Sequence, residues 1–465
     1  AQHRSLLKGN IFHLGCGVLY FMNFSLFLFF LIAIQGICLY VGRRGSKKVE
    51  DRESYFLAGR SLKIFPLMMT FIATQIGGGV LLGAAEEAFC YGYGGILYPL
   101  GVALGLIFLG MGPGKRLAEG SLTTVVSIFE VFYGSKKLRK IAFLLSAGSL
   151  FFILVAQVIA LDRLFSSFPF GKYVTVAFWI VLASYTSTGG FRGVVRTDVI
   201  QAGFLLIAVL VCGVSVWLSV PKSLSVLDPF QSLPCAKLSN WIFMPMLFML
   251  VEQDMVQRCV AASSPKRLQW AAVGAGLVLL LFNFIPLFLG SLGAKAGLKA
   301  GCPLIDTIAY FCNPSLAAVM AAAIGVAILS TADSLMNAVS QLIAEEYPTL
   351  KAPYYRYLVL GLAVAAPLVA IGFTNIVDVL ILSYSLSVCC LSVPVGFYLL
   401  APKGRRVSGA AAWAGVLVGA LGYGWVQIVS LGMFGELLAW VGSLVAFSFV
   451  GFIEITWKNK VKTQT

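Results

Sequence analysis

Ionisable side chains are scarce in this chain, and histidine is almost missing. Charged residues make up 11% of the 465 positions, and the only two histidines, His3 and His13, stand near its beginning. The ten cysteines form no C-x-x-C pair and show no spacing typical of a metal site. No serine–lysine or paired-aspartate arrangement lies at the centre of an apolar run. We therefore predict that the chain is not an enzyme and binds no organic cofactor.

Apolar residues are abundant instead, and they set the fold class. They make up 59% of the chain, and its mean hydropathy is +0.91. The apolar runs recur at about 20 residues, the length of helix that crosses a bilayer. We predict an all-α polytopic membrane protein with 13 transmembrane helices, whose lipid partner is the bilayer itself. The predicted spans are residues 22–41, 65–89, 93–112, 141–162, 172–188, 198–219, 240–257, 270–293, 315–343, 356–373, 376–400, 410–429 and 435–456.

The net charge of +15 does not indicate a nucleic-acid partner, because its placement follows the membrane. Under the 13-span topology, 26 of the 34 lysines and arginines fall on one side, Arg192, Arg196 and Arg258 among them. This is the asymmetry that marks cytoplasmic loops. We expect a plasma (inner) membrane protein with an external N-terminus and a cytoplasmic C-terminus. Residues 1–21 precede the first span, and we read them as an N-terminal extension that need not be native.

A glycine triplet interrupts the second span near its centre, in the stretch Ile72–Gly79. Glycine costs about 1 kcal/mol per residue in a helix relative to alanine, so three in succession favour unwinding. An unwound segment at this depth exposes carbonyls around Ala73 and Ile76, which attract a cation, and amides that attract a polar solute group. The alternative is a small-residue face for helix packing, although adjacent glycines lack its usual spacing.

A second break is predicted in span 240–257, where Pro245 interrupts the helix. Glu252, Gln253 and Asp254 follow closely, and such groups cannot all face lipid. We expect Glu252 or Gln253 to face a cavity and Asp254 to lie near the cytoplasmic mouth. In the alternative, the span ends earlier and all three residues are interfacial.

Hydroxyl and carboxyl groups cluster in span 315–343. Ser330 and Thr331 lie one turn after Ala327, and Asp333 and Ser334 follow directly. Hard cations such as sodium prefer oxygen ligands, and this cluster offers hydroxyl, carbonyl and carboxylate oxygens within two turns. Serine and threonine in membrane helices also bond the carbonyl four residues earlier, which is the plainer interpretation.

Residues 188–201 are predicted to form a cytoplasmic loop that leads into the next span, because the segment contains Arg192 and Arg196. Asp198 stands where that next helix should begin. It is either a helix N-cap or a residue of an ion path.

Four segments together resemble the sodium/solute symporter family, and the resemblance runs from about Met22 to the C-terminus. The matching segments are Ser54–Ser61, Gly189–Gln201, Val256–Ser263 and Ser330–Ser334. The resemblance implies a LeuT-type fold with two inverted five-helix repeats, one helix before them and two after. The expected divisions are 22–64 for the first helix and its cytoplasmic loop, 65–219 and 240–400 for the repeats, and 401–465 for the last two helices and a short tail.

The resemblance also implies site residues. The sodium ion would be held by Ala73, Ile76, Ala327, Ser330 and Thr331. A second sodium site or an exit path would include Asp198, Asp333 and Ser334. We assign the substrate site to Gln75, Gly77, Gly78, Gly79, Tyr98, Phe152, Phe248 and Glu252.

The glycine-rich motif is most similar to that of the choline-transporter branch, where aromatic residues cage a quaternary ammonium. Gln75 and Glu252 stand at the matching positions here, and Phe152 keeps an aromatic near the third helix of the repeat. We therefore expect a hydrogen-bonding solute, cationic or neutral, rather than choline.

The predicted function is sodium-coupled symport, in which sodium influx drives import of a small polar organic solute by alternating access. The alternative is a transporter-like sensor that binds solute without productive transport. The fold is compatible with a monomer, and the sequence does not determine the oligomeric state.

Overall fold

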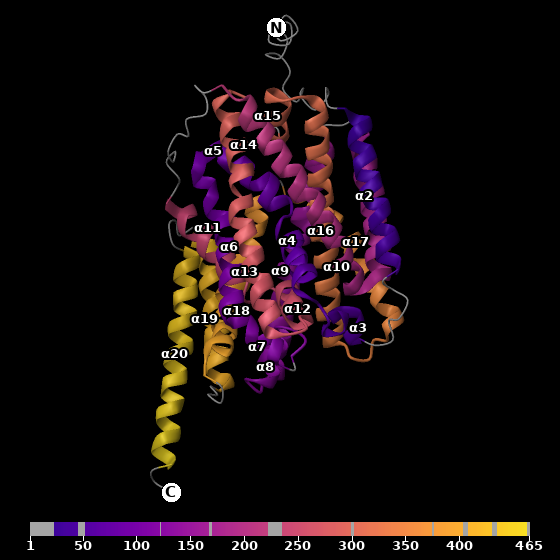
Figure 1. The fold of residues 1–465 in the computed structure, drawn as a ribbon. Coiled ribbons are helices and arrows are strands. Elements are labelled where there is room, and N and C mark those ends of the chain that lie inside the picture. Colours follow the sequence, from indigo (N-terminus) through magenta and orange to yellow (C-terminus); the bar gives the residue numbers. More distant parts are fainter. Residues whose placement is uncertain are drawn as a thin grey trace, which may run out of the picture.

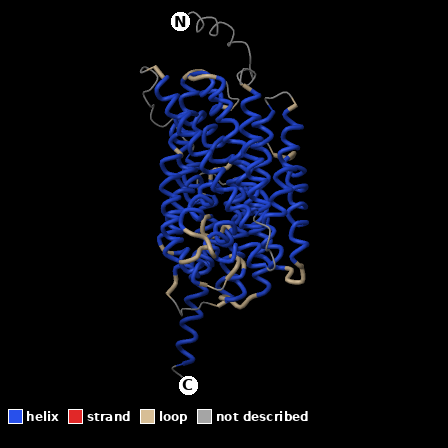
Figure 2. The backbone as a smooth tube through the Cα atoms, turned by 45° about the vertical axis from the view of Figure 1, so that its right-hand side comes forward, coloured by secondary structure: helices blue, strands red, loops and turns tan. Residues whose placement is uncertain are grey.

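The computed structural model is all-helical in the part of the chain that it describes. The described residues are 23–44, 52–120, 122–166, 170–221, 235–298, 302–373, 376–402, 408–429 and 435–462. Residues 1–21, which we read as an extension, lie outside them. Figures 1 and 2 show a bundle of helices that run mostly along one direction, with the short helices α3, α7 and α8 together near one end.

The first part of the described chain contains α2 (Phe24–Arg44), α3 (Arg52–Leu57), η3 (Ala58–Arg60), α4 (Ile64–Gln75), the π-helix η4 (Gly79–Gly83), α5 (Ala84–Tyr91), η5 (Gly92–Ile96), α6 (Leu97–Met111), α7 (Pro113–Glu119), α8 (Ser127–Val131), α9 (Lys136–Ser166) and α10 (Gly171–Ser219). The second part contains α11 (Cys235–Phe248), α12 (Gln253–Ala261), α13 (Pro265–Phe282), α14 (Phe284–Lys295), α15 (Pro303–Phe311), α16 (Pro314–Glu346), α17 (Ala352–Ala370), α18 (Ile376–Leu400), α19 (Gly409–Val429) and α20 (Gly435–Lys462).

Nine helical stretches within the described residues are long and apolar enough to cross a membrane, which supports an integral membrane protein. Several of the 13 predicted spans appear in another form. The helix α10 runs through two of them, and Gly79–Met111 joins the end of one to the next. The first halves of the two interrupted spans, α4 and α11, are shorter helices of 12 and 14 residues. The count of 13 therefore stays a prediction.

The helix α16 lies at the centre of the bundle. Of the residues in its most apolar 18-residue stretch, 83% are buried, whereas the corresponding shares are 28% in α19 and 22% in α20. It packs against α9, α10 and α2, and α19 packs mainly on α20 at the periphery (Figure 1). A hydroxyl-rich central helix that contacts both α9 and α10 is well placed to carry an ion site.

Both predicted helix interruptions are present, and one is displaced from its expected position. The helix α4 ends at Gln75, and η4 resumes the helical course at Gly79. The helix α11 continues past Pro245 to Phe248, so the expected break at the proline is wrong. The chain unwinds after Phe248 and becomes helical again at Gln253. Proline lacks a backbone N–H and crowds the preceding turn, but α11 remains helical at Pro245 and ends one turn later.

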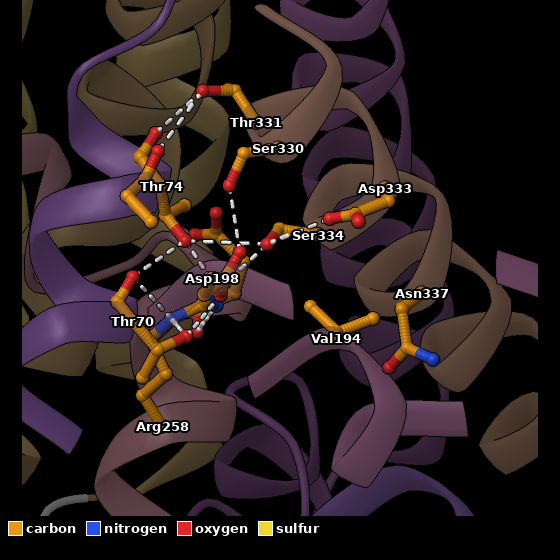
Figure 3. Close-up of polar contacts among 12 residues, drawn as sticks. Thr70, Thr74, Val194, Asp198, Arg258, Ser330, Thr331, Asp333, Ser334 and Asn337 are labelled. Carbon is orange, nitrogen blue, oxygen red and sulfur yellow. Dashed lines mark hydrogen bonds and ion pairs between the residues drawn. The ribbon is translucent and has the colours of Figure 1, made fainter. Parts of the chain in front are cut away.

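The predicted loop at residues 188–201 is also corrected. The helix α10 is continuous through this segment, apart from a kink at Gly190, where φ is 56° and ψ is −170°. A Cβ added there would lie 2.9 Å from the carbonyl oxygen of Tyr55, and a positive φ is costly for other residues. The kink directs the second half of α10 so that Asp198 points into the bundle (Figure 3).

Candidate functional site

Two backbone carbonyls at the end of α4 approach one hydroxyl of α16 at the first helix break (Figure 3). Thr331 Oγ1 on α16 lies 3.4 Å from the carbonyl oxygen of Ala73, 3.1 Å from that of Thr74 and 3.2 Å from that of Ala327. One hydroxyl proton can serve only one of these acceptors at a time. The bond to Ala327 is the one that a membrane threonine ordinarily makes to the carbonyl four residues earlier, so the carbonyls that the helix break adds are those of Ala73 and Thr74. Carbonyl and hydroxyl oxygens of this kind are suited to a hard cation.

The local sequence explains why α4 ends at this point. Ile76 leaves helical geometry with φ of −89° and ψ of 73°, which frees the carbonyls of the last turn of α4. Gly77 follows in very close contact with its neighbours. A Cβ at this position would lie 2.7 Å from Thr331 Oγ1 and 2.8 Å from Gln157 Oε1. Glycine is therefore required here because only a bare backbone can approach α16 and α9 so closely.

Ser330 does not face these carbonyls in this conformation. Its hydroxyl donates to Asp198 Oδ1 at 2.7 Å, and Thr70 donates to the other carboxylate oxygen. Asp198 is buried inside α10, far from the helix start at Gly171, so the N-cap interpretation is wrong. Asp198 instead joins α4, α10 and α16 at the centre of the bundle.

Arg258 is a buried residue, and not the loop residue that the charge distribution along the sequence indicates. It was counted among the cytoplasmic basic residues, yet its side chain is 0% exposed and its Nη2 lies 3.5 Å from Asp198 Oδ2. Its guanidinium donates to Thr70 and Thr74 of α4 and, at 2.8 Å, to Ser334 of α16. A buried charge requires such partners. The segment Val256–Ser263, which contains Arg258 and matches the family motif, was the sequence signal that could have indicated its burial.

Asp333 and Ser334 lie beside this network. The Tyr185 hydroxyl donates to Asp333 Oδ2 at 3.2 Å, and the Thr74 hydroxyl donates to Ser334 Oγ at 3.3 Å. Both residues of α16 are 0% exposed. The residues assigned to a second ion site or exit path are thus neighbours, with the guanidinium of Arg258 bonded to two of them.

A small buried cavity of about 20 Å³ lies between the two helix breaks. This volume accommodates roughly one water molecule, so an organic solute would fit here only after the surrounding helices move apart. Gln75 Nε2 donates to Glu252 Oε2 at 3.4 Å across the cavity, and the hydroxyls of Tyr98 and Tyr384 lie 3.3 Å apart. The polar and aromatic residues that line the cavity are Thr74, Gln75, Tyr98, Gln157, Glu252, Asp254, Thr331 and Tyr384.

Most of the predicted substrate residues lie at this cavity. Those that line it are Gln75, Gly77, Gly79, Tyr98 and Glu252. Gly78 adjoins it and donates its N–H to Gln157 Oε1 at 2.9 Å, and Phe248 packs on Tyr384 with ring centroids 4.6 Å apart. Phe152 does not line the cavity, because its ring packs against Phe373 at 6.0 Å.

Four polar residues of the cavity were not predicted there from the sequence, namely Thr74, Gln157, Asp254 and Tyr384. Gln157 and Tyr384 are single polar residues in apolar helices, and no local motif marks them. Asp254 was expected near the cytoplasmic mouth, but it is 0% exposed and lines the cavity. Asp254 is the second residue of α12, so the direction of its side chain depends on the residue at which the break ends.

Comparison with known proteins finds similarity to transporters. A model of the sodium:solute symporter family matches residues 55–229. The human high affinity choline transporter 1 is 25% identical over 354 residues, which cover 68% of this chain and 60% of that protein. The sodium/pantothenate symporter of Escherichia coli (strain K12) is 30% identical over 189 residues, or 39% of each protein. The chain thus spans about 60% or less of these curated relatives.

Solved structures agree with this assignment at the level of the fold. A sodium-coupled sialic acid symporter superposes with a TM-score of 0.75, covering 92% of this chain and 97% of that one at 15% identity. The protein MhsT, solved in complex with L-phenylalanine, gives a TM-score of 0.57 over 83% of this chain and 98% of that one, also at 15% identity. These relatives are transporters, in agreement with the prediction that the chain is not an enzyme. The predicted resemblance to the sodium:solute symporter family is thereby confirmed, in a chain whose helices adopt a LeuT-like transporter fold.

Proposed function

We propose that this chain is a sodium-coupled secondary active symporter that imports a small polar organic solute by alternating access. The observation that carries the proposal is the approach of the Thr331 hydroxyl of α16 to the Ala73 and Thr74 carbonyls at the end of α4. Such a set of oxygens at a mid-bundle helix break is suited to a monovalent cation that binds and leaves reversibly.

The proposed sodium site consists of Ala73, Ile76, Ala327, Ser330 and Thr331. Thr331 already contacts the carbonyls, and Ser330 would join them if its hydroxyl rotated away from Asp198. For Asp198, Asp333 and Ser334 we favour an exit path over a permanently available second site. Arg258 pairs with Asp198 and donates to Ser334, so a second cation could bind there only after the guanidinium moves.

The proposed solute site is the cavity between the two helix breaks. It is lined by residues of α4, η4, α6, α9, α12, α16 and α18, so relative movement of these helices would open it to either side. In this proposal, residues 65–219 and 240–400 are the two inverted repeats within a 13-helix topology. The N-terminus is external and the C-terminus cytoplasmic, and a monomer is sufficient for transport.

Reconstitution into liposomes tests the proposal directly. An inward sodium gradient should drive accumulation of a radiolabelled solute chosen by a thermal-shift screen, because a ligand that binds only the folded state raises its stability. An equal potassium gradient is the control. Solute binding without sodium-driven accumulation would instead support the sensor interpretation.

A further inference from the structure

The buried centre of the protein contains more acid than base. Asp198, Asp333, Glu252 and Asp254 are each at most 4% exposed. Arg258 is the only fully buried lysine or arginine among the described residues. One guanidinium cannot neutralise four carboxylates, and an isolated buried charge costs several kcal/mol. The excess must be balanced by protons or by cations from outside.

The position of Arg258 decides which acid is left without a partner. Its guanidinium pairs with Asp198 and donates to Ser334, on the side of the proposed ion path. Toward Asp254 it reaches only the backbone carbonyl, at 2.9 Å from Nη1. Neither carboxylate oxygen of Asp254 accepts a well-formed hydrogen bond in the described part of the chain, and its side-chain partner in the break is another acid, Glu252.

Asp254 lines the cavity together with Glu252, which belongs to the same helix break. Glu252 has two side-chain partners, the carboxyl of Asp254 in the same break and the Gln75 amide. The contact with the amide is weak, because this nitrogen at 3.4 Å is also 3.4 Å from the sulfur of Met255. A stronger donor could therefore displace this amide at little cost. The break presents two carboxyl groups to the cavity, and neither is held by a protein cation.

The rest of the lining is suited to an organic cation more than to a bare metal ion. Val80, Leu335 and Leu380 supply apolar surface beside the acids. The rings of Tyr98 and Tyr384 stack with centroids 6.3 Å apart on the same wall. Acceptors together with aromatic and aliphatic groups in one lining are typical of sites for small charged organic molecules.

We propose that the solute carries a compact cationic nitrogen with N–H donors, a primary or secondary ammonium or a guanidinium, that binds between Asp254 and Glu252. This inference rests on the proposed function, since it identifies the substrate class of the same cavity. The site discriminates by hydrogen bonding, because a quaternary ammonium has no N–H and leaves the carboxylates unpaired.

Thermal-shift titration of the purified full-length chain in sodium buffer tests this. The probes are ethanolamine, its mono- and dimethyl derivatives, choline and ethylene glycol, together with putrescine and guanidinium. We expect the N–H cations to stabilise the protein, affinity to fall about tenfold or more from an N–H cation to its quaternary analogue, and the neutral diol to have no effect. Stabilisation by a neutral or anionic solute alone would overturn the inference and leave symport intact.

Asp254→Asn separates binding from folding. It should abolish the shift produced by N–H cations while the ligand-free protein melts at or above the wild-type temperature, because an uncompensated buried charge is removed. Asp162→Asn is the matched control, an exposed acid of α9 that should leave the shifts unchanged. If Asp254→Asn binds the cations as the wild type does, the inference is wrong, and a proton or a sodium ion neutralises this carboxylate instead.

Discussion

The two helix breaks that face each other across the cavity are built on opposite chemistry. The first, between α4 and η4, is filled by protein, since Gln157 accepts the Gly78 N–H and Thr331 approaches the freed carbonyls. The second, between α11 and α12, holds Asp254 beside another acid, Glu252, and no donor among the described residues makes a well-formed bond to either oxygen of Asp254. One break thus offers neutral carbonyl dipoles and the other offers full negative charge.

This difference assigns distinct tasks to the two breaks. Carbonyls and hydroxyls bind an ion weakly enough for it to leave, which a coupling ion requires. A buried carboxylate binds more strongly and discriminates more sharply, which suits solute recognition. Arg258 lies between the two regions, because it pairs with the Asp198 carboxylate of the ion path and donates to the backbone carbonyl of Asp254 at the cavity.

The largest effect is expected from removing the charge that separates the two regions. Arg258→Met leaves Asp198 buried and unpaired, which should lower the free energy of unfolding by about 3–5 kcal/mol. Arg267→Met, at an exposed position, should change it by less than about 0.5 kcal/mol. Thermal unfolding in detergent measures both. The double variant Arg258→Met with Asp198→Asn should recover much of the loss, and a double variant as unstable as the single one would contradict the pairing.

Adding one methyl group at the first break is expected to have the next largest effect. The Cβ of Gly77→Ala would collide with Thr331 Oγ1 and Gln157 Oε1, so α4 and α16 must separate at a cost of about 1–3 kcal/mol. Sodium activation of uptake should shift to higher concentration. Gly148→Ala is the control, because its Cβ meets nothing within 4 Å. Equal sodium curves for the two variants would show that the close contact is unimportant.

The smallest of the three effects concerns the two hydroxyls of α16. Thr331→Ala removes the group that contacts three carbonyls and should weaken sodium dependence about tenfold or more, or about 1.4 kcal/mol. Ser330→Ala should also weaken it, but less, since its hydroxyl donates to Asp198 in this conformation.

Thr307→Ala is the control for these variants, because Thr307 is a buried threonine that donates to the Leu289 carbonyl in another part of the bundle. Sodium-activation curves of uptake are the measurement. If the curves of Thr331→Ala and Thr307→Ala coincide, the proposed ion site is misplaced.

The sequence by itself determined the features that act locally along the chain. Apolar runs of bilayer length predict membrane helices, and a glycine triplet predicts a break, because both follow from the backbone of one segment. The hydroxyl cluster of α16 and the glycine motif were identified as partners through the family resemblance. Their contact at Thr331 agrees with that prediction.

Only the tertiary structure decided which charges meet. Arg258 looked like a cytoplasmic charge and Asp254 like a residue of the mouth, since each stands at the end of an apolar run. The helix α11 extends past Pro245 to Phe248, and α12 begins at Gln253. The residue at which α12 begins determines the directions of the Asp254 and Arg258 side chains. Partners of a buried charge come from other helices, here α4, α10 and α16, and their distance in space is not encoded in the spacing of any one segment.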